Sequence, residues 1–336
     1  MKVVTSRWSA VSAVPFSFML SAMLLALCLS VNAQQSTKIP RIGFLSLTPG
    51  PSSTSSGAFQ QGLHELGYVE GKNIAIEYRY AAGRIDRLPE MAAELVRLNV
   101  DVIVTAATPP SQAAKDATKT IPIVMAAVGD PVATGLVASL AKPGGNITGQ
   151  TIFSSEMTGK RLDLLKEVVP RATRIGVLAY GPTPFTAHFL KETEAAAQAL
   201  GLKLRPFEVL DPREFGNAFG AITKERAGAL LVQQNPLFLE HRQRIVELAA
   251  KSHLPAMYEI VDWVDAGGLV AYGVHLPDLY RRAAVYVDKI LKGRKPADLP
   301  VEQPTKFEFI INLKAAKQIG LTIPPNVLAR ADRVIK

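Results

Sequence analysis

Eight residues with side chains suited to binding a small molecule lie where predicted strands end. Such positions matter because the ligands of open α/β sheets bind beyond the carboxyl ends of the strands. An amino acid could set its carboxylate against hydroxyl groups, its ammonium against a carboxylate and its side chain against tyrosine rings. The candidate ligand-binding residues are Ser46, Thr108, Asp130, Tyr180, Asn235, Tyr258, Glu259 and Tyr272.

Several of these positions also have a purely structural interpretation. Asp130-Pro131 is a strong signal for the start of a helix, with Asp as N-cap and Pro in the first turn. Thr108 and Asn235 also precede prolines and could cap helices in the same way. Ser46 opens a Ser-rich loop that could hold an anion or form a simple turn. Both interpretations stay open at each position. The prediction of a ligand-binding site rests on the convergence of these residues on one cleft.

Motifs for catalysis and for cofactors are absent from the sequence. It contains no phosphate-binding loop, no G-x-G-x-x-G after the first predicted strand, no G-x-S-x-G and no H-E-x-x-H. Its five histidines share no metal-ligand spacing. We therefore expect no catalytic residues, no cofactor and no metal. The alternative is an exported α/β enzyme that acts on a small molecule in the same cleft, with Asp130 and Glu259 as the only evident carboxylate pair.

The N-terminus has the pattern of a cleaved signal peptide. Lys2 and Arg7 precede an apolar run at 16–29 that is short for a membrane span, and Val31-Asn32-Ala33 has the small residues that signal peptidase recognises. The pattern predicts removal of residues 1–33, a mature chain that begins at Gln34, and a periplasmic location. Cys28 is the only cysteine, so the mature chain would form no disulfide.

The net charge of +9 is spread over the chain without a basic run or interleaved aromatic residues. Such dispersed charge is typical of a solvated surface, so we expect no nucleic-acid partner. A hydrophobic content of 48% with 20% charged residues indicates a well-packed α/β protein.

Short β-branched runs alternate with amphipathic stretches from Arg41 onward, a pattern that predicts parallel sheets covered by helices. The expected helices of the first half are 56–66, 86–98, 111–118 and 132–140. The expected strands are 42–47, 74–80, 102–106 and 123–126 in the first half, and 175–180, 202–209, 229–233, 256–258 and 269–272 in the second.

The two halves of the chain resemble each other. The string at 41–45 matches that at 174–178, and Ile121-Pro122 matches Leu254-Pro255 at the same offset. We therefore expect two doubly wound parallel-sheet lobes joined by a multi-strand hinge. The predicted ranges are 40–149 plus about 275–305 for the N-terminal lobe, 150–274 for the C-terminal lobe, and 306–336 for a segment packed on the lobes. A ligand in the cleft would contact both lobes and favour their closure.

Longer strings support a resemblance to a known family. The chain resembles ABC transporter substrate-binding proteins with the type I periplasmic-binding fold, including members that bind tryptophan or phenylalanine. The strings are those at 62–73, 102–109, 121–131, 135–149, 174–178, 290–300 and 312–324.

This resemblance implies a monomeric receptor that delivers a small molecule to an ABC permease in the inner membrane. It also implies that Thr108, Asp130, Asn235 and the Tyr258-Glu259 segment lie on cleft loops. The sequence departs from the aromatic-binding pattern at Met257-Tyr258-Glu259, where an Asp-containing loop is usual, and at 181–185. The resemblance therefore leaves the identity of the ligand open.

Overall fold

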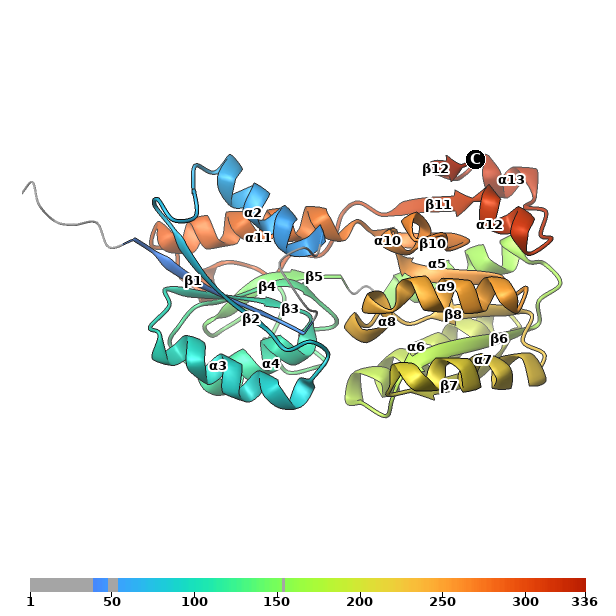
Figure 1. Ribbon diagram of the computed structural model, residues 1–336, viewed down its shortest axis with the longest axis horizontal. Helices are drawn as coiled ribbons and strands as arrows, with labels where there is room; N and C mark the ends of the chain where they lie inside the picture. The colour runs from blue at the N-terminus through green and yellow to red at the C-terminus, as the bar shows by residue number, and fades with distance from the viewer. Residues whose placement is uncertain (1–38, 48–53, 153–154) are drawn as a thin grey trace, which may run out of the picture. The chain divides into compact units, whose positions relative to one another are not determined.

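The computed structural model describes residues 39–47, 54–152 and 155–336, and all elements below lie in the unit Pro40–Lys336 (Figure 1). The predicted signal peptide lies outside the described residues, as does the 48–53 part of the Ser-rich loop. The described chain forms two α/β lobes, each built on its own sheet.

The first sheet contains five parallel strands in the order β2-β1-β3-β4-β5. Helices α2 (Thr54–Glu65) and α11 (Leu276–Leu291) cover one face, and α3 (Leu88–Arg97) and α4 (Thr108–Ala117) cover the other (Figure 1). Burial of every residue of β3 and β4 fits a parallel sheet covered on both faces. The strands are β1 (Arg41–Ser46), β2 (Ala75–Tyr80), β3 (Val102–Ala106), β4 (Ile123–Val128) and β5 (Ile147–Thr151).

The second sheet contains seven strands in the order β12-β11-β10-β9-β8-β6-β7, and only the β10–β11 pair is antiparallel. The strands are β6 (Arg174–Tyr180), β7 (Lys203–Val209), β8 (Ala229–Val232), β9 (Ala256–Ile260), β10 (Val270–Val274), β11 (Glu308–Asn312) and β12 (Arg333–Ile335).

Helices cover both faces of this second sheet as well. One face carries α5 (Ser155–Val168), α6 (Pro184–Ala199), α12 (Leu313–Gln318) and α13 (Pro325–Leu328). The other carries α7 (Phe215–Lys224), α8 (Pro236–Glu240), α9 (Arg242–Lys251) and α10 (Asp262–Asp265). Short 3-10 turns are η2 (Ile85–Arg87), η3 (Pro212–Glu214) and η4 (Pro296–Asp298).

The internal repeat corresponds to equivalent strands of the two sheets. The strings at 41–45 and 174–178 lie on β1 and β6, and Pro122 and Pro255 precede β4 and β9. The order β7-β6-β8-β9-β10 reproduces β2-β1-β3-β4-β5. The predicted fold class of two parallel-sheet lobes is therefore confirmed.

The chain passes between the two sheets three times. It leaves the first sheet after β5, returns from β10 into α11, and leaves again after η4 to enter β11. The last passage pairs with the first, because the Glu302 N–H donates to the Gly149 carbonyl at 2.9 Å and the Thr151 N–H donates to the Glu302 carbonyl at 3.0 Å. We take these passages as the boundaries of the two lobes.

The structure differs from the expected elements at three main places. The stretch expected to be a helix at 132–140 forms turns, because Gly135 has φ +70° and the Val137 N–H donates back to the Pro131 carbonyl at 3.1 Å. β5 was not expected as a strand, since polar residues and Gly149 interrupt its apolar pattern. The segment 306–336 was expected to pack on the lobes, but its β11 and β12 extend the second sheet.

Gly149 and Gly273 occupy similar places on β5 and β10, the last strands of the repeated β-order. At either position a Cβ would lie closer than 3.0 Å to a backbone carbonyl oxygen of the preceding strand, that of Met125 or of Glu259. The strand pairing also shifts register beside both glycines. Each fifth strand thus approaches its neighbour closely just before the chain leaves the sheet.

We predict that Gly149→Ala lowers the free energy of unfolding by more than about 2 kcal/mol, because Gly149 combines φ +132° with this close backbone approach. Urea unfolding would measure the change. Gly220→Ala is the matched control, since Gly220 lies in α7 with nothing near its Cβ position and the substitution should stabilise by about 0.5–1 kcal/mol. Equal free energies of unfolding for Gly149→Ala and wild type would contradict the requirement for glycine at this position.

Candidate functional site

A cavity of about 420 Å³ lies where strands of both sheets end. The first lobe contributes the ends of β1 and β3 and the residues after β4 and β5, and the second contributes the end of β6 and the segment after β8. α11 adds Leu276 and Tyr280 from the passage between the sheets. The cavity therefore lies at the carboxyl ends of parallel strands, which is where open α/β sheets bind their ligands.

The walls of this cavity are mainly apolar. Tyr180, Phe185 and Tyr280 supply aromatic rings, and Phe185 of α6 packs against Gly129, where a Cβ would collide with the ring. No side chain with a formal charge occurs among the described residues that line the cavity. Such a lining suits an apolar or planar ligand body, with recognition left to a few neutral polar groups.

Four of the eight candidate residues line the cavity, namely Ser46, Thr108, Tyr180 and Asn235. Asn235 caps α8, because its Oδ1 accepts the Leu237 N–H at 2.8 Å. Thr108 is the first residue of α4 and not its cap, and its Oγ1 accepts the Gly129 N–H at 3.3 Å. Capping and ligand contact are therefore compatible for Asn235, because the two functions use different atoms of its side chain.

Asp130 adopts the capping arrangement. Its Oδ1 accepts the N–H groups of Val132 and Ala133, each at 2.9 Å, while Oδ2 lies 4.0 Å from Nε2 of His188 in α6. The residue is not among those that line the cavity, although its neighbour Gly129 is. The Asp130 carboxylate thus stabilises a turn and lies close to His188 of the other lobe, and its predicted contact with a ligand ammonium stays a prediction.

Tyr258 and Tyr272 are not at the cavity. Tyr258 is 1% exposed and stacks on Trp263 with ring centroids 4.7 Å apart, and burial raises the pKa of its phenol. Tyr272 stacks on Phe307 at 6.0 Å. β9 and β10 each run two residues beyond their predicted ends, so both tyrosines lie within strands and pack on neighbouring aromatic rings.

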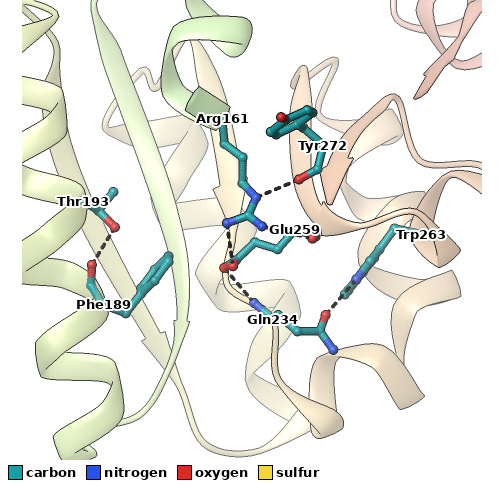
Figure 2. Close-up of polar contacts among 7 residues, drawn as sticks. All are labelled: Arg161, Phe189, Thr193, Gln234, Glu259, Trp263 and Tyr272. Atoms are coloured by element: carbon teal, nitrogen blue, oxygen red, sulfur yellow. Dashed lines mark hydrogen bonds and ion pairs between the residues drawn. The ribbon is translucent and has the colours of Figure 1, made fainter. Parts of the chain in front are cut away.

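Glu259 is likewise absent from the cavity lining and forms a buried ion pair with Arg161 of α5 (Figure 2). The Arg161 Nη1 lies 3.1 Å from the Glu259 Oε2, and its Nε donates to the Tyr272 carbonyl at 2.8 Å. Burial raises the pKa of the Glu259 carboxyl, which Arg161 opposes, and burial lowers the pKa of Arg161. The Glu259 carboxylate therefore forms a buried ion pair and is not among the residues that line the cavity.

Gln234 is a cavity residue that the sequence analysis missed. Its backbone N–H donates to the Glu259 Oε1 at 3.0 Å, and its side-chain Oε1 accepts the Trp263 Nε1–H at 3.3 Å (Figure 2). The available signal was its place two residues after the end of β8 and beside Asn235. Arg161 carried no such signal, because its partner Glu259 lies 98 residues away in sequence.

The described part of the chain contains no group of three or more His, Cys, Asp or Glu side chains placed to hold a metal ion. Within the same residues, no helix combines the length and the apolar character needed to span a membrane.

Comparisons with known proteins agree with this architecture. Residues 44–335 match the family model described as ABC transporter substrate binding protein. A tyrosine-binding protein of Clostridioides difficile is 29% identical over 296 residues, which cover 85% of this chain and 82% of that protein.

Two solved structures are also similar. A conserved domain protein from Vibrio cholerae has a TM-score of 0.83 at 30% identity, over 88% of this chain and 100% of that one. An ABC domain from Streptococcus pneumoniae in complex with L-Trp has a TM-score of 0.82 at 30% identity, over 88% and 99% of the two chains. These similarities confirm the predicted periplasmic-binding-protein type I fold.

We predict that Arg161→Met lowers the free energy of unfolding by about 3–5 kcal/mol, because it leaves the Glu259 carboxylate buried without its partner. The double variant Arg161→Met/Glu259→Met should recover most of this loss, since neither charge then remains. Chemical denaturation of the single and double variants measures the coupling. Additive losses would show that the two side chains do not act as a pair.

The loss in Arg161→Met should also depend on pH. Burial already raises the pKa of Glu259 above its ordinary value of 4.5, and removing the opposing cation raises it further. A carboxyl with a higher pKa in the folded state binds more protons there, so stability falls as the pH rises through that range. Denaturation at about pH 5 and about pH 8 should therefore show a larger loss at the higher pH.

Proposed function

This chain belongs to the ABC transporter substrate-binding protein family, and from this premise we propose that it binds an aromatic small molecule in the cavity between its lobes. A ligand can favour closure of two lobes only when it contacts both of them. The observation that carries the proposal is the cavity of about 420 Å³, lined from both sheets and by three aromatic rings.

The size and lining of the cavity favour a ligand in the range of an aromatic amino acid. Small-molecule sites of about 300–1,000 Å³ with mainly apolar walls enclose most of a ligand of this size. The relatives support the same class, since one is named a tyrosine-binding protein and another was solved with L-Trp. We place the ring of the ligand among Tyr180, Phe185 and Tyr280, which offer flat apolar surfaces.

Ligand binding would be coupled to movement of the lobes. The three passages of the chain between the sheets form a hinge, and a ligand that contacts both lobes stabilises the closed arrangement by its extra contacts there. The closed receptor would then be recognised by the permease. We further propose that residues 1–33 direct export to the periplasm, that they are then removed, and that the mature receptor is a monomer.

We propose that the ligand is released unchanged. Asp130 and Glu259 were the only evident carboxylate pair for catalysis, yet Asp130 binds the N–H groups of its own turn and Glu259 is neutralised by Arg161. A general acid or base must lie within hydrogen-bonding reach of its substrate. These contacts favour the receptor over the exported enzyme, and recovery of intact ligand after prolonged incubation would test the choice.

We predict one-to-one binding of L-tyrosine or L-tryptophan by isothermal titration calorimetry. Ala133→Phe should weaken this binding at least about tenfold, because the added ring enters the cavity. Ala195→Phe is the control, since Ala195 is exposed on α6 away from the cavity and should leave binding unchanged. Equal effects of the two substitutions would place the site elsewhere, and failure of both amino acids to bind would count against an aromatic ligand.

Trp263 should report binding through Gln234. Its indole N–H donates to the side chain of this cavity residue, so a ligand that contacts Gln234 changes the surroundings of the indole. We predict a saturable change in tryptophan emission when L-tyrosine is added, with excitation at a wavelength that tyrosine does not absorb. The change should vanish in Trp263→Phe while calorimetric binding persists. If the Trp263→Phe variant keeps the change, the signal does not come from Trp263.

A further inference from the structure

We infer that Gln234 and Asn235 determine specificity by donating hydrogen bonds to an oxygen acceptor of the ligand, such as a carboxylate or carbonyl. This inference rests on the proposed function and adds the chemistry that the second lobe recognises. Both residues lie in the segment after β8, beyond Gln233, and both line the cavity. What they offer to a ligand depends on which end of each amide the protein already uses.

The orientation of the Gln234 amide follows from its partner. An indole N–H can only donate, so the atom that faces Trp263 Nε1 at 3.3 Å must be the amide oxygen. The NH₂ group of Gln234 is then the end left for the cavity. No described residue accepts a hydrogen bond from this group, so Gln234 presents two N–H donors to a ligand.

The same argument applies to Asn235. A backbone N–H can only donate, so the atom that accepts from the Leu237 N–H at 2.8 Å is the amide oxygen. The NH₂ group of Asn235 therefore also remains as a donor. Across the cavity, Thr108 Oγ1 already accepts the Gly129 N–H, which leaves its hydroxyl hydrogen to donate. Donors thus come from both lobes.

Gln112 shows that this orientation is not general in the cavity. Its Nε2 donates to the Asp116 carboxylate at 2.9 Å, so its oxygen is the end left for a ligand. The first-lobe wall therefore offers an acceptor at Gln112, while the second-lobe wall offers donors at Gln234 and Asn235. A ligand with an oxygen acceptor at one end and a donor at the other would match both walls.

The contacts behind Gln234 hold its amide in place. Its backbone N–H is fixed by Glu259, which is itself fixed by Arg161, and its side chain is fixed by Trp263 (Figure 2). A donor held in this way loses little conformational freedom when the ligand binds, which favours affinity and selectivity. Arg161 and Glu259 therefore act as positioning residues for a group that contacts the ligand.

The test compares three probes, L-tryptophan, indole-3-propanoate and tryptamine, by calorimetry. Indole-3-propanoate keeps the oxygen acceptor and lacks the amine, whereas tryptamine keeps the amine and lacks the acceptor. Wild-type protein should bind indole-3-propanoate at least about tenfold more tightly than tryptamine. Gln234→Glu replaces the donor by a carboxylate that can still accept from Trp263, so it should reverse this preference.

Gln198→Glu is the matched control, because Gln198 lies on the exposed side of α6 and the substitution adds the same charge. It should leave the preference as in wild type. Equal binding of the two analogues by wild type, or an equal loss for both in Gln234→Glu, would overturn the inference and leave the receptor assignment intact. Failure of all three probes to bind wild type would overturn the proposed aromatic ligand and this inference together.

Discussion

The buried pair between Arg161 and Glu259 connects α5, β9 and β10 to Gln234, a residue on the second-lobe side of the cavity. One guanidinium bonds to the carboxylate and to two backbone carbonyls, those of Tyr272 and Glu259, while the other carboxylate oxygen accepts the Gln234 N–H. Such a pair is tolerated in the interior only when its geometry satisfies the remaining donors and acceptors, because removing two charges from water is costly. Here it joins α5, β9 and β10 to Gln234, the first cavity-lining residue after β8.

The same pair also lies close to the passage between the lobes. Tyr272, whose carbonyl accepts from Arg161, is two residues before the end of β10, and α11 begins two residues after that end. Gly273 lies between these points and permits the close approach of β10 to β9. The equivalent Gly149 does the same for β5 and β4. In both sheets a glycine thus permits the same close approach between two strands, just before the chain leaves the sheet.

Much of the fold could be predicted from the sequence, because parallel strands and their helices leave a strong local pattern. The strand at 102–106 has the predicted bounds, and the repeat identified equivalent strands in the two sheets. The stretch at 132–140 misled the prediction, since Asp130-Pro131 starts a turn as readily as a helix and only Gly135 shows which one forms. Edge strands such as β12 depend on pairing with distant residues, which no local pattern records.

The sequence located cavity-lining residues where these lie at strand ends, and it did not locate the side chains that form long-range pairs. Ser46, Thr108, Tyr180 and Asn235 line the cavity because each follows or ends a strand as expected. Glu259 was expected to meet the ligand, but its partner in α5 is invisible to any local pattern, and with that partner the carboxylate turns inward. A prediction from sequence alone can therefore assign too many charged side chains to a cavity, because some of them form ion pairs with one another in the layer behind its wall.

A cavity wall whose described residues carry no formal charge affects how easily a receptor can close and open. A bare ion in the cavity wall would have to lose its hydration at each closure and regain it at each opening, and desolvating an ion costs several kcal/mol. Amides such as Gln234 and Asn235 carry dipoles that the protein already orients. In the binding mode that we propose, closure over these amides would cost less and their hydrogen bonds would still select for an acceptor. A wall of this kind binds selectively while remaining able to open, as a protein that must hand its ligand on requires.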